Sequence, residues 1–96
     1  MMDVVVFPCK GKPYKESVTG DLKSLQNLVG GLIEPIALPN EYGKGNLTEM
    51  LRLLGVKVRK PLALVNEEGL IHGMGRNQWF PEFVGPVVVM ERDSLK

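Results

Sequence analysis

Cysteine and histidine are almost absent: the 96 residues include one of each, Cys9 and His72. A single cysteine cannot form an intrachain disulfide, and this pair cannot supply the ligands of a structural zinc site. We therefore expect no metal centre and no cofactor. The sequence also lacks a disulfide framework and a signal-peptide pattern, which is typical of a protein that works in a reducing cytosol.

A strong charge of either sign is also missing, because 12 basic and 11 acidic residues leave a net charge of +1. Such a chain has no overall field that would draw it onto nucleic acid or an anionic membrane. None of the apolar runs approaches the ~18 residues that a membrane-spanning helix needs. We expect neither nucleic acid nor a membrane as a partner.

The hydrophobic content of the sequence, 44%, is that of an ordinary globular domain. Its length fits a single domain over 1–96. Apolar and β-branched runs predict strands at 3–7, 14–18, 32–38, 62–65 and 84–90, with a return strand at 70–72 after a turn at 66–69. Pro61 is expected to separate an alternating segment, 56–59, from the strand that follows it.

Two helices are predicted. The first runs to Val29 with Asp21 as its N-cap and Gly30 just after its end. The second is short, covers 47–54, and lies in an apparent insertion at 40–55 that includes an N-cap at Asn46. The fold class is thus α+β, a small mixed and mostly antiparallel sheet of four to six strands with one or two short helices. Residues 91–96 are expected to form a flexible tail.

Three of the predicted strands are apolar at consecutive positions, around 4–7, 62–65 and 87–90. Such runs present apolar side chains to both faces of a sheet. Two short helices cover only part of that surface, which favours a homo-oligomer. The alternative is a monomer whose core is fully covered.

Signals for catalysis are weak. Cys9 and His72 have the chemistry of a nucleophile and its base, but a cysteine at a strand end is more often a small packing residue. Glu67 and Glu68 are neighbours in a turn, where side chains usually point apart into solvent. A hydrolytic enzyme is accordingly the weakest of the functional hypotheses.

Amides, cations and aromatics at turns and helix ends indicate instead a small polar ligand. Gly73-Met74-Gly75 lacks the spacing of a phosphate-binding loop, but donors and aromatics that follow it are typical of nucleotide sites. Each candidate also has a structural interpretation: Asn66 opens an Asx turn, the aromatics fill the core, and the cations protect a sheet edge. The candidate ligand-binding residues are Gln26, Lys57, Arg59, Asn66, Arg76, Asn77 and Trp79, with Phe80 as a second aromatic.

Two blocks of the sequence carry a family resemblance. Leu25-Gln26, Val29-Gly30-Gly31 and Ile33-Glu34 are followed by Asn66-Glu67-Glu68-Gly69, then by Asn77 and Val84-Gly85-Pro86. In this order they resemble the domain-of-unknown-function family number 3846, which is common in bacteriophages and mobile elements, over about residues 4–89. The resemblance implies a small phage or prophage accessory protein, in the host cytosol, and brings no catalytic residues. Residues 41–60 are longer than the usual family connection, and 75–77 stand where the family has a Pro-containing stretch.

Together these signals favour a viral accessory protein that binds and sequesters a nucleotide-derived ligand, with an anti-defence role. The alternative is a protein–protein interaction module that inhibits a host factor through the insertion at 40–60.

Overall fold

A computed structural model of the chain describes residues 2–38, 47–68 and 73–94. Its five strands form one antiparallel sheet in the order β2-β1-β5-β4-β3. The strands are β1 (Met2–Phe7), β2 (Tyr14–Val18), β3 (Ile33–Ala37), β4 (Pro61–Asn66) and β5 (Val87–Glu91). The helices are α1 (Leu22–Val29) and α2 (Leu47–Leu53), and a 3-10 turn, η1, covers Arg92–Ser94. The predicted α+β class and its antiparallel sheet are confirmed.

The sheet separates two hydrophobic cores because each of its three central strands, β1, β5 and β4, contains four consecutive apolar residues. Along β1, Val5 and Phe7 face one core, and Val4 and Val6 face the other. The same alternation holds in β4 and β5, where the register places Ala63 opposite Val89 and Leu64 opposite Val88. Side chains of one face therefore meet across the strands, which is the unit of sheet stabilisation.

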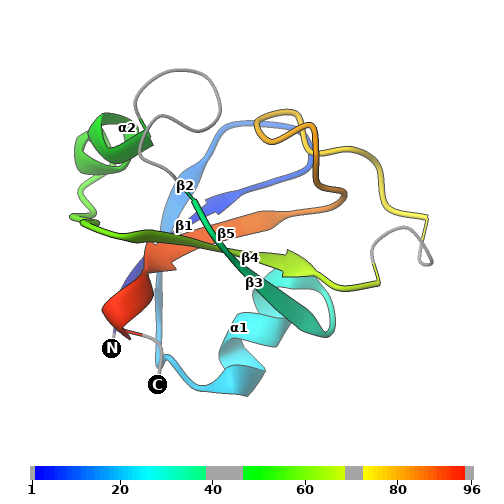
Figure 1. Cartoon of the computed structure of the whole chain (residues 1–96), viewed down its shortest axis with the longest axis horizontal. Coiled ribbons are helices and arrows are strands. Elements are labelled where there is room, and N and C mark those ends of the chain that lie inside the picture. The colour runs from blue at the N-terminus through cyan, green and yellow to red at the C-terminus, as the bar shows by residue number, and fades with distance from the viewer. Residues whose placement is uncertain (1, 39–46, 69–72, 95–96) are drawn as a thin grey trace.

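Helix α1 covers one face of the sheet, as Figure 1 shows below the strands, and its buried residues are Leu25 and Val29. Its start is fixed by Asp21, whose carboxylate accepts a hydrogen bond from the backbone N–H of Ser24 at 2.8 Å. That bond holds the pKa of Asp21 below its ordinary value. The helix ends at Gly30, where φ is +83° and a side chain would be strained. Both predicted caps are confirmed.

Helix α2 and the irregular segment 73–86 cover the opposite face, on the upper side in Figure 1. Leu47 and Leu51 of α2 are buried there beside Phe7 and Phe80. The three runs that motivated the oligomer are thus covered on both faces within one chain, since no side chain in 4–7, 62–65 or 87–90 is more than 6% exposed. The oligomer itself stays a prediction.

Several predicted element ends differ from the structure by one residue, and three differences at boundaries have a clear physical cause. Pro61 is the first residue of β4 and does not separate it from a preceding strand; the first position of a strand tolerates a missing N–H. The last strand begins at Val87 and not at residue 84, because Gly85 adopts a φ of +78° and Pro86 has no N–H. Glu91 closes β5 and η1 follows it, so the tail predicted from 91 does not begin there.

Other predictions fall on the remaining residues. The N-cap at Asn46, the insertion residues 40–46 and the return strand at 70–72 lie outside the described part of the chain, as do the last two residues of the predicted tail. The cations at 57 and 59 do not protect an open edge of β4, because both edges of that strand are paired, one with β3 and the other with β5. Within the described ranges no helix is long and apolar enough to span a membrane.

Candidate functional site

Asn77 is a structural anchor. Its side chain is 1% exposed, and its Nδ2 donates hydrogen bonds of 2.9 Å to the carbonyl oxygens of Phe7 and Gly85. Its Oδ1 accepts from the backbone N–H groups of Trp79 and Phe80, at 2.8 and 3.0 Å. Both ends of the amide are engaged in fixing the 73–86 segment to the end of β1, so no part of it faces a ligand.

The aromatics after Asn77 belong to the core. Phe80 is fully buried and meets Phe7 edge-to-face, with ring centroids 5.0 Å apart. Trp79 is half-buried against the same core, and its indole N–H donates to the carbonyl of Gly11 at 2.9 Å. The structural interpretation of both rings is confirmed. Arg76 is exposed, and its guanidinium donates to the Pro81 carbonyl at 2.9 Å within its own loop.

Cys9 lies next to this loop. Its thiol is 3.2 Å from the carbonyl oxygens of both Gly75 and Arg76, so its one hydrogen can be donated to either. His72, the base considered with it, lies outside the described residues. In the part of the chain that the structure describes, no three residues among His, Cys, Asp and Glu are grouped as metal ligands.

Asn66, at the end of β4, is 5% exposed. Its Oδ1 accepts from the N–H of Glu68 at 2.8 Å, which is the Asx turn that the sequence favoured. Its Nδ2 donates to the carbonyl of Val29 at 3.0 Å, in the last turn of α1. A Cβ added to Gly31 would lie 3.0 Å from the same Nδ2, so Asn66 sits directly behind the glycine pair.

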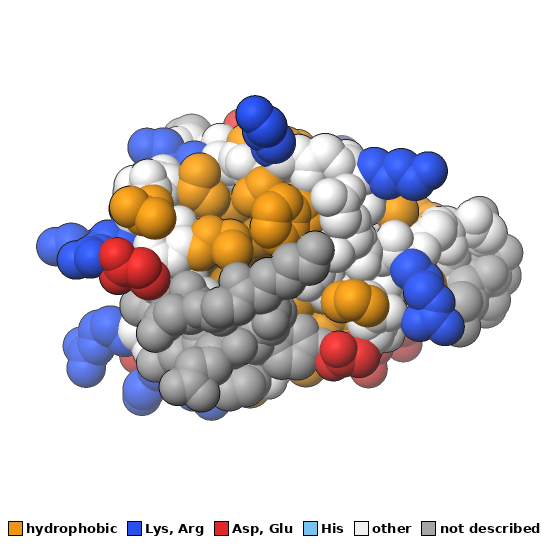
Figure 2. Space-filling view, turned by 90° about the horizontal axis from the view of Figure 1, so that it is seen from above, with side chains coloured by type: hydrophobic (Ala, Val, Ile, Leu, Met, Phe, Trp, Pro, Cys, Tyr) orange, Lys and Arg blue, Asp and Glu red, His pale blue; other side chains and the backbone are white. Residues whose placement is uncertain are grey.

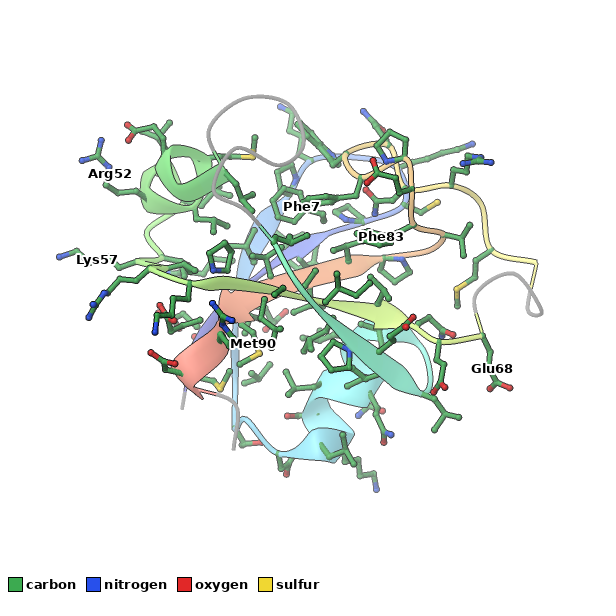
Figure 3. The ribbon with its side chains drawn as sticks, viewed as in Figure 1. Phe7, Arg52, Lys57, Glu68, Phe83 and Met90 are labelled. Carbon is green, nitrogen blue, oxygen red and sulfur yellow. The ribbon has the colours of Figure 1, made fainter. Side chains whose placement is uncertain are left out.

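On the outer side of that glycine pair lies an open depression of about 540 Å³. One face of α1 forms its floor, because Lys23, Gln26, Asn27 and Gly30 follow the i, i+3, i+4, i+7 spacing of a helix. Gly31, Leu32 and Glu68 complete its lining. Figure 3 shows Glu68 pointing outward beyond the end of β4.

The two side-chain amides of this depression differ from those of Asn66 and Asn77 in one respect. The carbonyl of Gln26 accepts from the N–H groups of Gly30 and Gly31, at 2.8 and 3.1 Å. The side-chain amides of Gln26 and Asn27, however, make no hydrogen bond to any residue within the described ranges. Each amide therefore offers a donor and an acceptor to a molecule bound beside α1.

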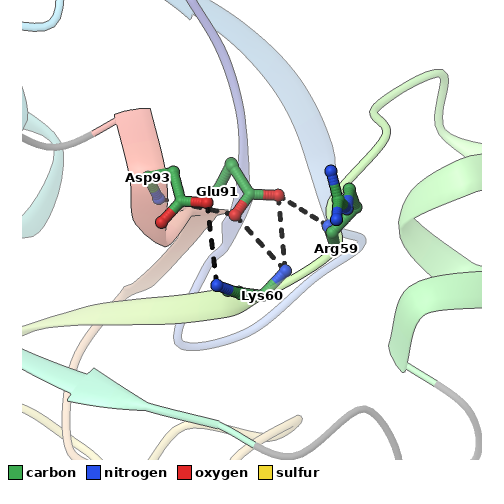
Figure 4. Close-up of polar contacts among 4 residues, drawn as sticks. All are labelled: Arg59, Lys60, Glu91 and Asp93. Atoms are coloured by element: carbon green, nitrogen blue, oxygen red, sulfur yellow. Dashed lines mark hydrogen bonds and ion pairs between the residues drawn. The ribbon is translucent and has the colours of Figure 1, made fainter.

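Lys57 and Arg59 lie at the opposite end of β4 from Asn66, and both side chains are exposed. At this end the carboxylate of Glu91 accepts from the backbone N–H of Arg59 at 2.6 Å and from that of Lys60 at 3.3 Å (Figure 4). The hydrogen bond from Arg59 is the main reason why the pKa of Glu91 lies below its ordinary value. Lys60 also approaches Asp93, at 4.0 Å.

The seven candidate residues thus do not form one site. Gln26 lines the depression and Asn66 supports it from behind, whereas Arg76, Asn77 and Trp79 belong to the 73–86 segment and Lys57 and Arg59 to the far end of β4. Lys23, Asn27, Leu32 and Glu68 were missed as site residues. The sequence contained part of the information needed to find them, because Lys23, Gln26 and Asn27 share a helix face opposite Leu25 and Val29.

Comparisons with known proteins give no relative. No protein-family model, curated protein or solved structure matches the chain.

Proposed function

We propose that the chain binds a small polar ligand of the nucleoside or nucleotide class in the depression beside α1. The observation that carries the proposal is the pair of adjacent side-chain amides, Gln26 and Asn27, that face the depression without a partner in the described chain. An amide presents a donor and an acceptor side by side, which matches the Watson–Crick or Hoogsteen edge of a base. The depression's 540 Å³ falls within the usual range for small-molecule sites.

The rest of the lining supplies the other contacts that such a ligand needs. Leu32 is 51% exposed and offers an apolar surface to the ring of a base. Lys23 supplies a cation for a phosphate. Glu68 supplies a carboxylate, the group that accepts hydrogen bonds from ribose hydroxyls in dinucleotide-binding folds.

The charges also give the ligand an orientation. Lys23 lies in the first turn of α1, and Gly30 and Glu68 lie at its other end, roughly 10 Å along the axis at 1.5 Å per residue. The carboxyl end of a helix disfavours anions, and Glu68 adds to that effect. A phosphate is therefore expected at the Lys23 end, and the ribose at the glycine end.

Isothermal titration calorimetry against adenosine, AMP, cyclic AMP and ADP-ribose tests the proposal. We expect at least one of these to bind, and the double variant Gln26→Ala, Asn27→Ala to weaken binding about tenfold or more, since each lost hydrogen bond costs roughly 1 kcal/mol. Gln78→Ala is the matched control, because Gln78 is an exposed amide outside the depression. Failure of all four compounds to bind would overturn the proposal.

Sequestration of a nucleotide-derived signal, with an anti-defence role in a phage-infected host, is the biological purpose that this binding would serve. It rests on the resemblance to family 3846. The hydrolytic alternative gains no support from the position of Cys9.

A further inference from the structure

The chain from α2 to β4 is basic although the whole protein is nearly neutral. Between residues 50 and 66 the sequence contains Arg52, Lys57, Arg59 and Lys60 and no acidic residue. Arg52 pairs with Glu49 one turn earlier on α2, and Lys60 approaches Asp93. Lys57 and Arg59 form no salt bridge with any residue that the structure describes. Neither charge is neutralised by an ion pair there, although the guanidinium of Arg59 also acts electrostatically on the nearby carboxylate of Glu91 and helps to lower its pKa.

These two side chains point to the same side. Val56 and Val58 are buried and Lys57 and Arg59 are exposed, so the segment alternates as an extended chain does. Two residues of extended chain span about 6.6 Å. Figure 3 shows Lys57 and Arg52 projecting outward on the same side of the molecule, from the segment before β4 and from α2.

An exposed apolar side chain, that of Leu53, precedes Lys57 by four residues in the chain. Leu53, the last residue of α2, is 79% exposed, and it is the most exposed large hydrophobic residue of the described chain. Met50 and Leu54 are half-buried next to it on the core of this face. Figure 2 looks down on this side of the molecule and shows hydrophobic side chains gathered on it, with Lys and Arg side chains and a few Asp and Glu side chains around them.

We infer that Leu53, Lys57 and Arg59 form a docking surface for a protein partner that presents an acidic amphipathic helix. The Cβ atoms of acidic residues at positions i and i+4 of a helix lie about 6 Å apart, close to the spacing of Lys57 and Arg59 along the extended chain. An apolar side chain on the same stripe of the partner helix would then pack on Leu53. A nucleic acid would match the charge but would find an aliphatic side chain where single strands prefer an aromatic one. This surface is separate from the depression beside α1.

Fluorescence anisotropy with a synthetic peptide tests the inference. The probe is a labelled Ala-based helix that carries Glu at i and i+4 and Leu on the same stripe. We expect saturable binding that weakens as salt is added, because exposed charges are screened. We expect Lys57→Gln with Arg59→Gln to weaken binding about tenfold or more, and Leu53→Ser to weaken it severalfold.

The control variant Lys10→Gln with Lys12→Gln removes the same charge from the exposed loop after β1, at the other end of the sheet. It should bind as the wild type does, and circular dichroism should be unchanged in every variant. Absent binding, or equal loss in the control variant, overturns the inference. So does equal affinity for a peptide in which Leu is replaced by Ala. Tighter binding to a single-stranded DNA oligonucleotide or to vesicles of phosphatidylcholine and phosphatidylserine also overturns it.

Discussion

The side-chain nitrogen of Asn66 lies 3.0 Å from the carbonyl oxygen of Val29 and joins the end of β4 to the last turn of α1. This hydrogen bond explains why a polar residue is buried next to the candidate site without being part of it. The same amide accepts from Glu68, so it fixes two of the segments that line the depression.

Replacing Asn66 should therefore reduce stability. Asn66→Ala leaves the Val29 carbonyl and the Glu68 N–H without their partner, and we expect a loss of about 2 kcal/mol in the free energy of unfolding. Urea denaturation followed by circular dichroism measures it. Asn27→Ala is the control, since Asn27 is exposed and should be neutral. Wild-type stability of Asn66→Ala would show that the amide is not an anchor.

Asn77 should be the more sensitive of the two buried amides. Asn77→Asp keeps the size and the acceptor but places an oxygen opposite the carbonyls of Phe7 and Gly85. We expect a loss of about 3 kcal/mol, at the upper end for buried groups left without a partner. Thermal and urea unfolding give the value, with Gln78→Glu as an exposed change of the same chemistry. Equal stability of the two variants would contradict the structural role.

The hydrogen bonds to Glu91 predict a dependence of stability on pH. These hydrogen bonds lower the pKa of Glu91 in the folded protein below its ordinary value of 4.5. The ionised carboxylate therefore stabilises the fold at pH values above 4.5. The contribution is lost as the pH falls through the lowered pKa. Glu91→Gln should thus be less stable than the wild type at neutral pH, and the gap should close in acid. Urea denaturation of both proteins at a series of pH values from neutral to acid measures this difference in stability. A gap independent of pH would contradict the assignment.

The helices and most strands could be predicted because their signals are local. Asp21 and Gly30 cap α1 by rules that involve only a few neighbouring residues, and the apolar runs marked β1, β4 and β5. The strand order could not be predicted, because it depends on pairings such as Val6 with Val88.

The site was predicted less well for the same reason. Asn77 was predicted as a ligand contact because its hydrogen-bond partner, the carbonyl of Phe7, lies 70 positions earlier in the chain. No local sequence pattern indicates a hydrogen bond over that separation. Asn66 had a local interpretation, the Asx turn, and that part was correct. The sequence pattern indicated Gln26 as a site residue but not its neighbour Asn27. The depression that both residues line is formed only when the chain at Glu68 lies against the end of α1, which no local pattern predicts.

The central claim, that the amides beside α1 hold a nucleoside-type ligand, is tested most directly by a ¹H–¹⁵N NMR titration with each of adenosine, AMP, cyclic AMP and ADP-ribose, read for the compound that binds most tightly. We predict that the side-chain NH₂ signals of Gln26 and Asn27 shift saturably, together with the backbone signals of Gly31 and Glu68, while the side-chain signals of Asn66 and Asn77 stay in place. Unchanged Gln26 and Asn27 signals, or shifts confined to residues outside the depression, would contradict the account.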